Sequence, residues 1–95
     1  MFARVAVINR GEPAIRLFRA VRELNEERGY GIKVIAFHTE SEQRALFVRS
    51  ADEAVCLREG GTSSSPYLDR AELERALRVS RADAVWDRTR TRPRW

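Results

Sequence analysis

The sequence predicts an α/β fold in which a parallel sheet lies between layers of helices. Four short apolar runs are rich in β-branched residues and have the composition of strands. Stretches in which apolar residues recur at helical spacing separate these runs. Strands that alternate with helices favour parallel pairing through right-handed crossovers. The four expected strands are residues 3–8, 32–37, 54–57 and 84–86.

The first strand, residues 3–8, is almost continuously apolar after Arg4, as expected for a strand covered on both faces. A polar turn at residues 9–12 follows it. Pro13 suits the first helical position, where a missing N–H is no loss, and Gly29 is expected to end the helix. The expected buried stripe of this helix is Ala14, Leu17, Phe18, Val21 and Leu24, with Ile15 alongside.

The same helix carries a second, charged set of residues. Arg16, Arg19 and Glu23 follow one another at i, i+3 and i+7, so they share a face away from the apolar stripe. Such a set is either a solvated helix face or a surface for a partner, and both interpretations stay open at this point.

Capping patterns place the remaining helices. Thr39 and Glu42 form the pattern of a capping box, which predicts a helix through residues 45–48. Asp69, with Glu72 three residues later, is expected to cap a helix that precedes the last strand. Its expected stripe is Leu73, Ala76 and Leu77, with Val79 near its end.

Ligands of open parallel sheets bind beyond the carboxyl ends of the strands. Arg10 lies at such an end and could bind a carboxylate or phosphate, or could brace the neighbouring loops. We interpret His38 as a strand-end residue with its hydrogen bonds satisfied rather than as a catalytic base. We interpret Glu40 as an acidic residue in the first turn of a helix rather than as a ligand of a ribose. The first turn has one glycine and therefore lacks the dinucleotide fingerprint G-x-G-x-x-G.

Cysteine and histidine occur once each, as Cys56 and His38. We expect Cys56 to be a small buried residue. A catalytic thiol would need His38 as its base, and we assign no catalytic residue. No metal site is expected, because two such ligands are too few for a zinc site.

The net charge of +4 is unevenly distributed. The basic tail, residues 87–95, carries four Arg and one Asp, whereas residues 1–86 are near neutral. We expect two parts: a domain at residues 1–86 and a disordered basic tail. Nucleic-acid binding could use only the tail arginines and would be weak. No apolar run could span a bilayer and no signal peptide is recognisable, so a cytoplasmic location is expected.

The turn Asn9-Arg10-Gly11-Glu12 resembles the N-terminal domain of biotin carboxylase. That family includes the biotin-carboxylating parts of acetyl-CoA, propionyl-CoA and pyruvate carboxylases. The likeness continues in A-I-R-x-x-R-A-x-x-E-L of the first helix, in A-L-F-V-R-S-A-D-E-A-V-C, in Y-L and in A-D-A-V-W. It covers residues 3–86 in the family's order, and the N-R-G-E turn together with A-D-E-A-V makes it specific.

The resemblance implies a three-layer pre-ATP-grasp, Rossmann-like fold. In the full-length family, an ATP-grasp module uses ATP and bicarbonate, with magnesium or manganese, to carboxylate biotin on a carrier protein. The family's homodimers use the first helix, and Arg16, Arg19 and Glu23 match those positions. This match favours the partner surface over a solvated face.

The sequence departs from the family after Trp86, where Asp87-Arg88-Thr89 replaces a glycine-rich turn. It contains no recognisable ATP-grasp sequence, so we expect a truncated member whose cofactor-binding residues stay unassigned. On its own, such a chain should be inactive. The alternatives are a non-catalytic interaction or dimerisation module and a weak nucleic-acid binder.

Overall fold

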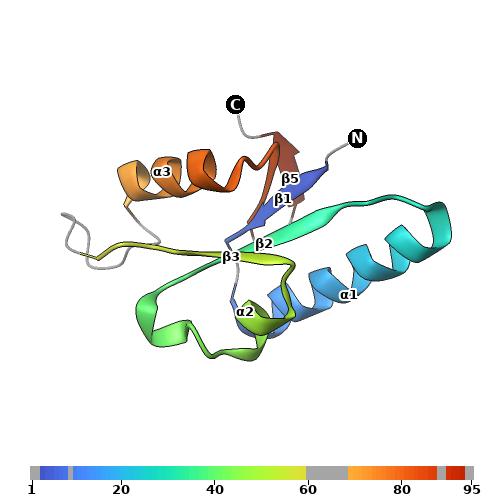
Figure 1. The fold of residues 1–95 in the computed structure, drawn as a ribbon, viewed down its shortest axis with the longest axis horizontal. Helices are drawn as coiled ribbons and strands as arrows, with labels where there is room; N and C mark the ends of the chain where they lie inside the picture. Colours follow the sequence, from blue (N-terminus) through green and yellow to red (C-terminus); the bar gives the residue numbers. More distant parts are fainter. Residues whose placement is uncertain (1–2, 9, 60–68, 88–89, 94–95) are drawn as a thin grey trace.

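The computed structural model describes residues 3–8, 10–59, 69–87 and 90–93. Strands and helices alternate along the chain up to β4, as the sequence predicts (Figure 1). The strands are β1 (Arg4–Val7), β2 (Lys33–His38), β3 (Glu53–Cys56), β4 (Ala84–Asp87) and β5 (Arg90–Pro93). The helices are α1 (Gly11–Arg28), the 3-10 turn η1 (Glu40–Glu42), α2 (Leu46–Ser50) and α3 (Arg70–Ser80).

The strands form one sheet in the order β3-β2-β1-β4-β5. β1 pairs in parallel with β2 and with β4, and β2 pairs in parallel with β3. The expected parallel sheet is therefore confirmed for the first four strands. The fifth, β5, runs antiparallel to β4.

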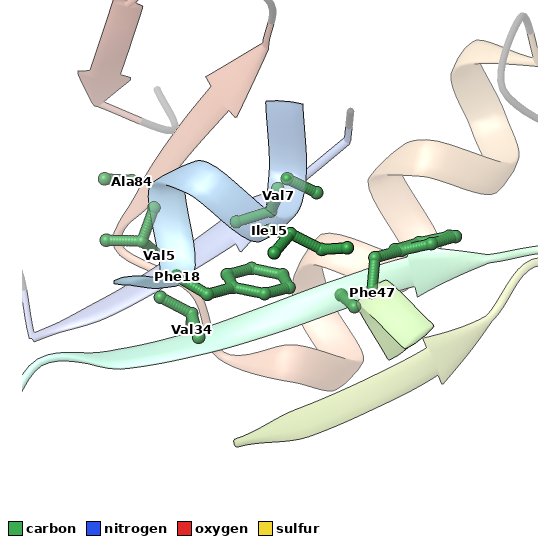
Figure 2. Close-up of a cluster of buried hydrophobic side chains, with 9 residues drawn as sticks. Val5, Val7, Ile15, Phe18, Val34, Phe47 and Ala84 are labelled. Atoms are coloured by element: carbon green, nitrogen blue, oxygen red, sulfur yellow. The ribbon is translucent and has the colours of Figure 1, made fainter. Parts of the chain in front are cut away.

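The sheet has a helix layer on each face, with α1 and α2 on one side and α3 on the other (Figure 1). Side chains alternate between the two layers, as the pleat of a strand requires. Val5 and Val7 join the cluster beneath α1 and α2, whereas Ala6 joins the cluster beneath α3. Figure 2 shows the first cluster, in which Phe18 of α1 lies beside Val34 of β2. The predicted three-layer fold is confirmed.

Glycine sets both ends of α1. The helix begins at Gly11, two residues before the expected start at Pro13, and Gly11 has a φ of 63°. Gly29 ends the helix in the left-handed conformation, and its N–H donates to the Asn25 carbonyl. This C-cap is the predicted one, because a residue with a side chain adopts a positive φ at a cost.

The two predicted caps form different amounts of helix. The Glu42 carboxylate accepts from the Thr39 N–H at 2.9 Å, yet only the three-residue turn η1 follows it. The separate helix α2 starts at Leu46. At α3, the Asp69 carboxylate accepts from the Glu72 N–H at 3.2 Å, so that N-cap is confirmed.

Two expectations are wrong at the edges of the sheet. Residues 90–93 of the expected disordered tail form β5, because the open edge of β4 supplies the backbone partners that the tail lacks within itself. Cys56 is exposed rather than buried, as its place on β3, the strand at one end of the strand order, permits.

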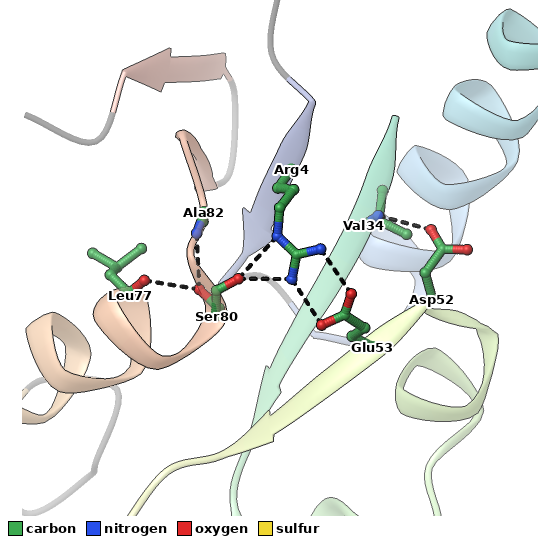
Figure 3. A network of polar contacts seen from close by, with 7 residues as sticks. All are labelled: Arg4, Val34, Asp52, Glu53, Leu77, Ser80 and Ala82. Carbon is green, nitrogen blue, oxygen red and sulfur yellow. Dashed lines mark hydrogen bonds and ion pairs between the residues drawn. The ribbon is translucent and has the colours of Figure 1, made fainter. Parts of the chain in front are cut away.

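Polar side chains tie the amino ends of the strands together (Figure 3). The Arg4 guanidinium donates to both oxygens of Glu53 at 2.8 and 2.7 Å, and also to the Ser80 carbonyl. The Asp83 carboxylate accepts from the Arg4 N–H, and the Asp52 carboxylate accepts from the Val34 N–H. Because Arg4 binds it, the pKa of Glu53 lies below its ordinary value.

Candidate functional site

The carboxyl ends of β1 and β2 are joined by an ion pair. Arg10, after β1, donates from Nη1 to Glu42 Oε2, which follows β2, at 3.4 Å. The Glu42 carboxylate also accepts from the hydroxyl of Thr39 at 2.9 Å. The Arg10 side chain is 61% exposed and that of Glu42 is 18% exposed. This contact supports the bracing interpretation of Arg10 over that of an anion ligand.

His38 lies at the end of β2 and is buried. Its Nδ1 is 2.8 Å from the Thr39 carbonyl oxygen. Since a carbonyl only accepts, Nδ1 carries the hydrogen. This contact agrees with the interpretation of His38 as a satisfied strand-end residue.

Cys56 is the register partner of His38 on β3. Within the described part of the chain, the two side chains share no hydrogen bond. Desolvation raises the pKa of the Cys56 thiol, and the Glu40 carboxylate raises it further. A thiol that keeps its proton is a poor nucleophile. The missing hydrogen bond and the raised pKa therefore give no support to a catalytic Cys–His pair.

At the carboxyl end of β3, an ion pair from α3 binds the backbone. The buried Glu72 carboxylate accepts from the Arg58 N–H and from Arg75 Nε, the latter at 2.9 Å. Arg75 Nη2 also donates to the Cys56 carbonyl at 3.1 Å. From the sequence, Glu72 is expected only as the acidic residue three positions after the N-cap Asp69. The i,i+3 spacing of Glu72 and Arg75 was the available signal for the pair.

The matched residues of the first turn are only partly described. Asn9 lies outside the described residues. Gly11 and Glu12 are exposed in the first turn of α1, and Arg10 is its N-cap residue. Across the described ranges, no three His, Cys, Asp or Glu side chains are placed to hold a metal ion. No step of ATP, metal or biotin chemistry is therefore assigned to these residues.

The charged set on α1 lies on the side of the helix that faces away from the sheet. Arg16, Arg19 and Glu23 are all exposed, whereas Ile15 and Phe18 of the same helix are buried. Among the described residues, the three charged side chains make no hydrogen bond or ion pair. They are thus exposed and accessible to a partner.

These features define a class of protein: a Rossmann-like α/β domain with polar turns at the carboxyl edge of its parallel strands. Comparison with known proteins identifies the family. The model of the family described as "Biotin carboxylase, N-terminal domain" matches residues 1–87. The chain belongs to this family, as the resemblance at the N-R-G-E turn implies.

Matches to individual proteins agree with this family assignment. The chain is 37% identical over 84 residues to the human mitochondrial propionyl-CoA carboxylase alpha chain. It is 37% identical over 84 residues to the biotin carboxylase of a Nostoc species. Each match covers 88% of this chain, but only 11% of the human relative and 17% of the Nostoc one. The chain thus corresponds to a small part of each.

A solved structure shows the same fold. The biotin carboxylase domain dimer of Hydrogenobacter thermophilus 2-oxoglutarate carboxylase, in complex with MgADP, ADP and bicarbonate, matches with a TM-score of 0.69 and 35% identity. The match covers 90% of this chain and 17% of that one.

None of the helices among the described residues combines the length and the apolar composition that crossing a bilayer requires.

Proposed function

We propose that this chain serves a biotin-dependent carboxylase as the N-terminal domain of its biotin carboxylase. The reaction of the whole enzyme would be the ATP-dependent carboxylation of biotin with bicarbonate. The observation that carries the proposal is the family match over residues 1–87, on a chain whose sheet and helices follow those of a biotin carboxylase domain. The complex of that solved relative with MgADP and bicarbonate supports the choice of substrates.

In this proposal the chemistry takes place on partner domains. An ATP-grasp module would hold ATP with magnesium or manganese, and a biotin carrier domain would present biotin. The described residues of this chain contribute a sheet whose ends carry the ion pairs Arg10–Glu42 and Arg4–Glu53. On its own, the chain is expected to give no bicarbonate-dependent ATP hydrolysis.

Complementation in trans tests the proposal. The Bacillus subtilis biotin carboxylase 1, which is 34% identical over 85 residues, is expressed without its matching N-terminal segment. Adding this chain should restore ATP hydrolysis that depends on bicarbonate and free biotin. The relative's own N-terminal segment serves as the positive control. If that segment restores activity and this chain binds without restoring any, the proposed function is wrong.

A second proposal concerns a partner for α1. The exposed set Arg16, Arg19 and Glu23 supports pairing of two chains through this helix, and the dimer of the Hydrogenobacter relative is consistent with it. Sedimentation velocity should show a dimer for the wild type. Replacing Arg16 and Arg19 with Glu should give a monomer with an unchanged circular dichroism spectrum. A wild type that is monomeric at every concentration contradicts this proposal.

A further inference from the structure

The outer edge of β3 carries a polar arrangement that neither the family match nor the proposed function uses. Among the residues that the structure describes, β3 is the last strand of the sheet on its side and pairs with β2 alone. The ion pair Glu72–Arg75 reaches from α3 to the backbone where β3 ends. The Arg75 and Glu72 side chains are only 20% and 10% exposed.

The direction of the backbone groups at this point follows from one hydrogen bond. The Leu57 N–H donates to the His38 carbonyl at 2.7 Å, so Leu57 faces β2. Backbone groups of successive residues in a strand point to opposite sides. The Cys56 carbonyl and the Arg58 N–H, on either side of Leu57, therefore point away from the sheet, toward the position of a further strand.

These two groups are what one residue of a further parallel strand would bind. That residue would donate its N–H to the Cys56 carbonyl and accept the Arg58 N–H on its own carbonyl. The Arg75 guanidinium takes the first role, at 3.1 Å, and the Glu72 carboxylate takes the second. The side-chain pair thus substitutes for the backbone of a neighbouring strand.

We propose that Glu72 and Arg75 close the edge of β3 and keep two copies of this chain from pairing through it. Open strand edges are templates for association, and native proteins block them with charged side chains. A second copy is the partner to which this edge is available by symmetry, since a two-fold axis can set β3 antiparallel to β3. Both Ala54 and Cys56 on this edge are exposed, which leaves room for such a contact once the pair is removed.

The test compares two double variants of α3. Glu72→Ala with Arg75→Ala removes the pair, whereas Glu74→Ala with Arg78→Ala removes two exposed charges of the same helix as a matched control. Sedimentation velocity across a concentration series should show at least tenfold stronger self-association for the first variant than for the wild type, with the control unchanged. Any association through α1 is common to all three proteins and cancels. A first variant with a native circular dichroism spectrum and wild-type association overturns the proposal.

Hydrogen exchange on the wild type gives an answer that does not require the variant to fold. The Arg58 N–H, bound by Glu72, should exchange at least tenfold more slowly than an amide in an unstructured peptide. Exchange of Arg58 at the unstructured rate overturns the proposal. Glu72→Gln, which keeps an oxygen acceptor for this N–H, should remain closer to the wild type in association than Glu72→Ala. Neither result depends on whether the chain supports carboxylation.

Discussion

Phe18 anchors α1 to the sheet, and its replacement by Ala tests that packing. The ring is 2% exposed and packs in the cluster with Val5, Ile15 and Val34. Truncating a buried Phe to Ala costs about 3–5 kcal/mol, from lost burial and from the cavity that remains. Since a domain of this length has a free energy of unfolding of about 5–14 kcal/mol, the variant should lose about a fifth of its stability or more.

Urea unfolding followed by far-UV circular dichroism measures this loss. With an m-value of about 1.5 kcal/mol/M, the midpoint should fall by about 2–3 M. Val79→Ala is the control, because Val79 is 60% exposed on α3 and its truncation should change stability by no more than about 0.5 kcal/mol. Equal midpoints for the two variants would show that α1 does not pack on the sheet through Phe18.

Three further predictions concern caps and charges. Arg75 lowers the pKa of Glu72, and Arg4 lowers the pKa of Glu53. Both carboxylates therefore stabilise the folded state at pH values above their unfolded pKa of about 4.3. The free energy of unfolding should therefore decline as the pH falls below about 4.3, with a shallower decline in Glu72→Gln; equal slopes in an acid titration contradict this origin. Gly29→Ala should cost about 1 kcal/mol by urea unfolding because φ is 69°, whereas Gly31→Ala should be nearly neutral. Asp69→Ala should cost about 1 kcal/mol through the lost N-cap and should reduce helical ellipticity; an unchanged midpoint would mean that the cap does not form in solution.

Local chemistry made much of this fold predictable. Helical spacing and β-branched runs predicted the succession of the first four strands and their helices along the chain, because each element buries a repeating apolar face. Single residues with a strong backbone preference, such as Gly29 and Asp69, marked helix ends to within a residue. The boundary between η1 and α2 was missed, because a capping box fixes where a turn begins and not how far it continues.

The two wrong predictions, at Cys56 and at residues 90–93, share a different cause, which is the tertiary arrangement of the strands. Cys56 reads as a core residue in a short apolar run, but its exposure depends on β3 being an outermost strand. The strand at residues 90–93 depends on the open edge of β4. Neither property is visible in the local sequence, since strand order is set by how the crossovers pack.

The candidate site was predictable in type and only partly in detail. The sequence places Arg10 and His38 at strand ends, but their partners, Glu42 and the Thr39 carbonyl, depend on how the loops after two strands meet. The Arg16, Arg19 and Glu23 set follows from helical spacing alone, and its exposure is observed. Its role in pairing stays a proposal.

A domain replacement tests the central claim most directly. Residues 1–86 of this chain are joined in place of the matching segment of Bacillus subtilis biotin carboxylase 1, which keeps the rest of that enzyme in one chain. We expect the chimera to retain ATP hydrolysis that depends on bicarbonate and biotin. A chimera that folds but has no such activity, beside an active enzyme rejoined at the same boundary, would contradict the assignment of this chain as a working biotin carboxylase N-terminal domain.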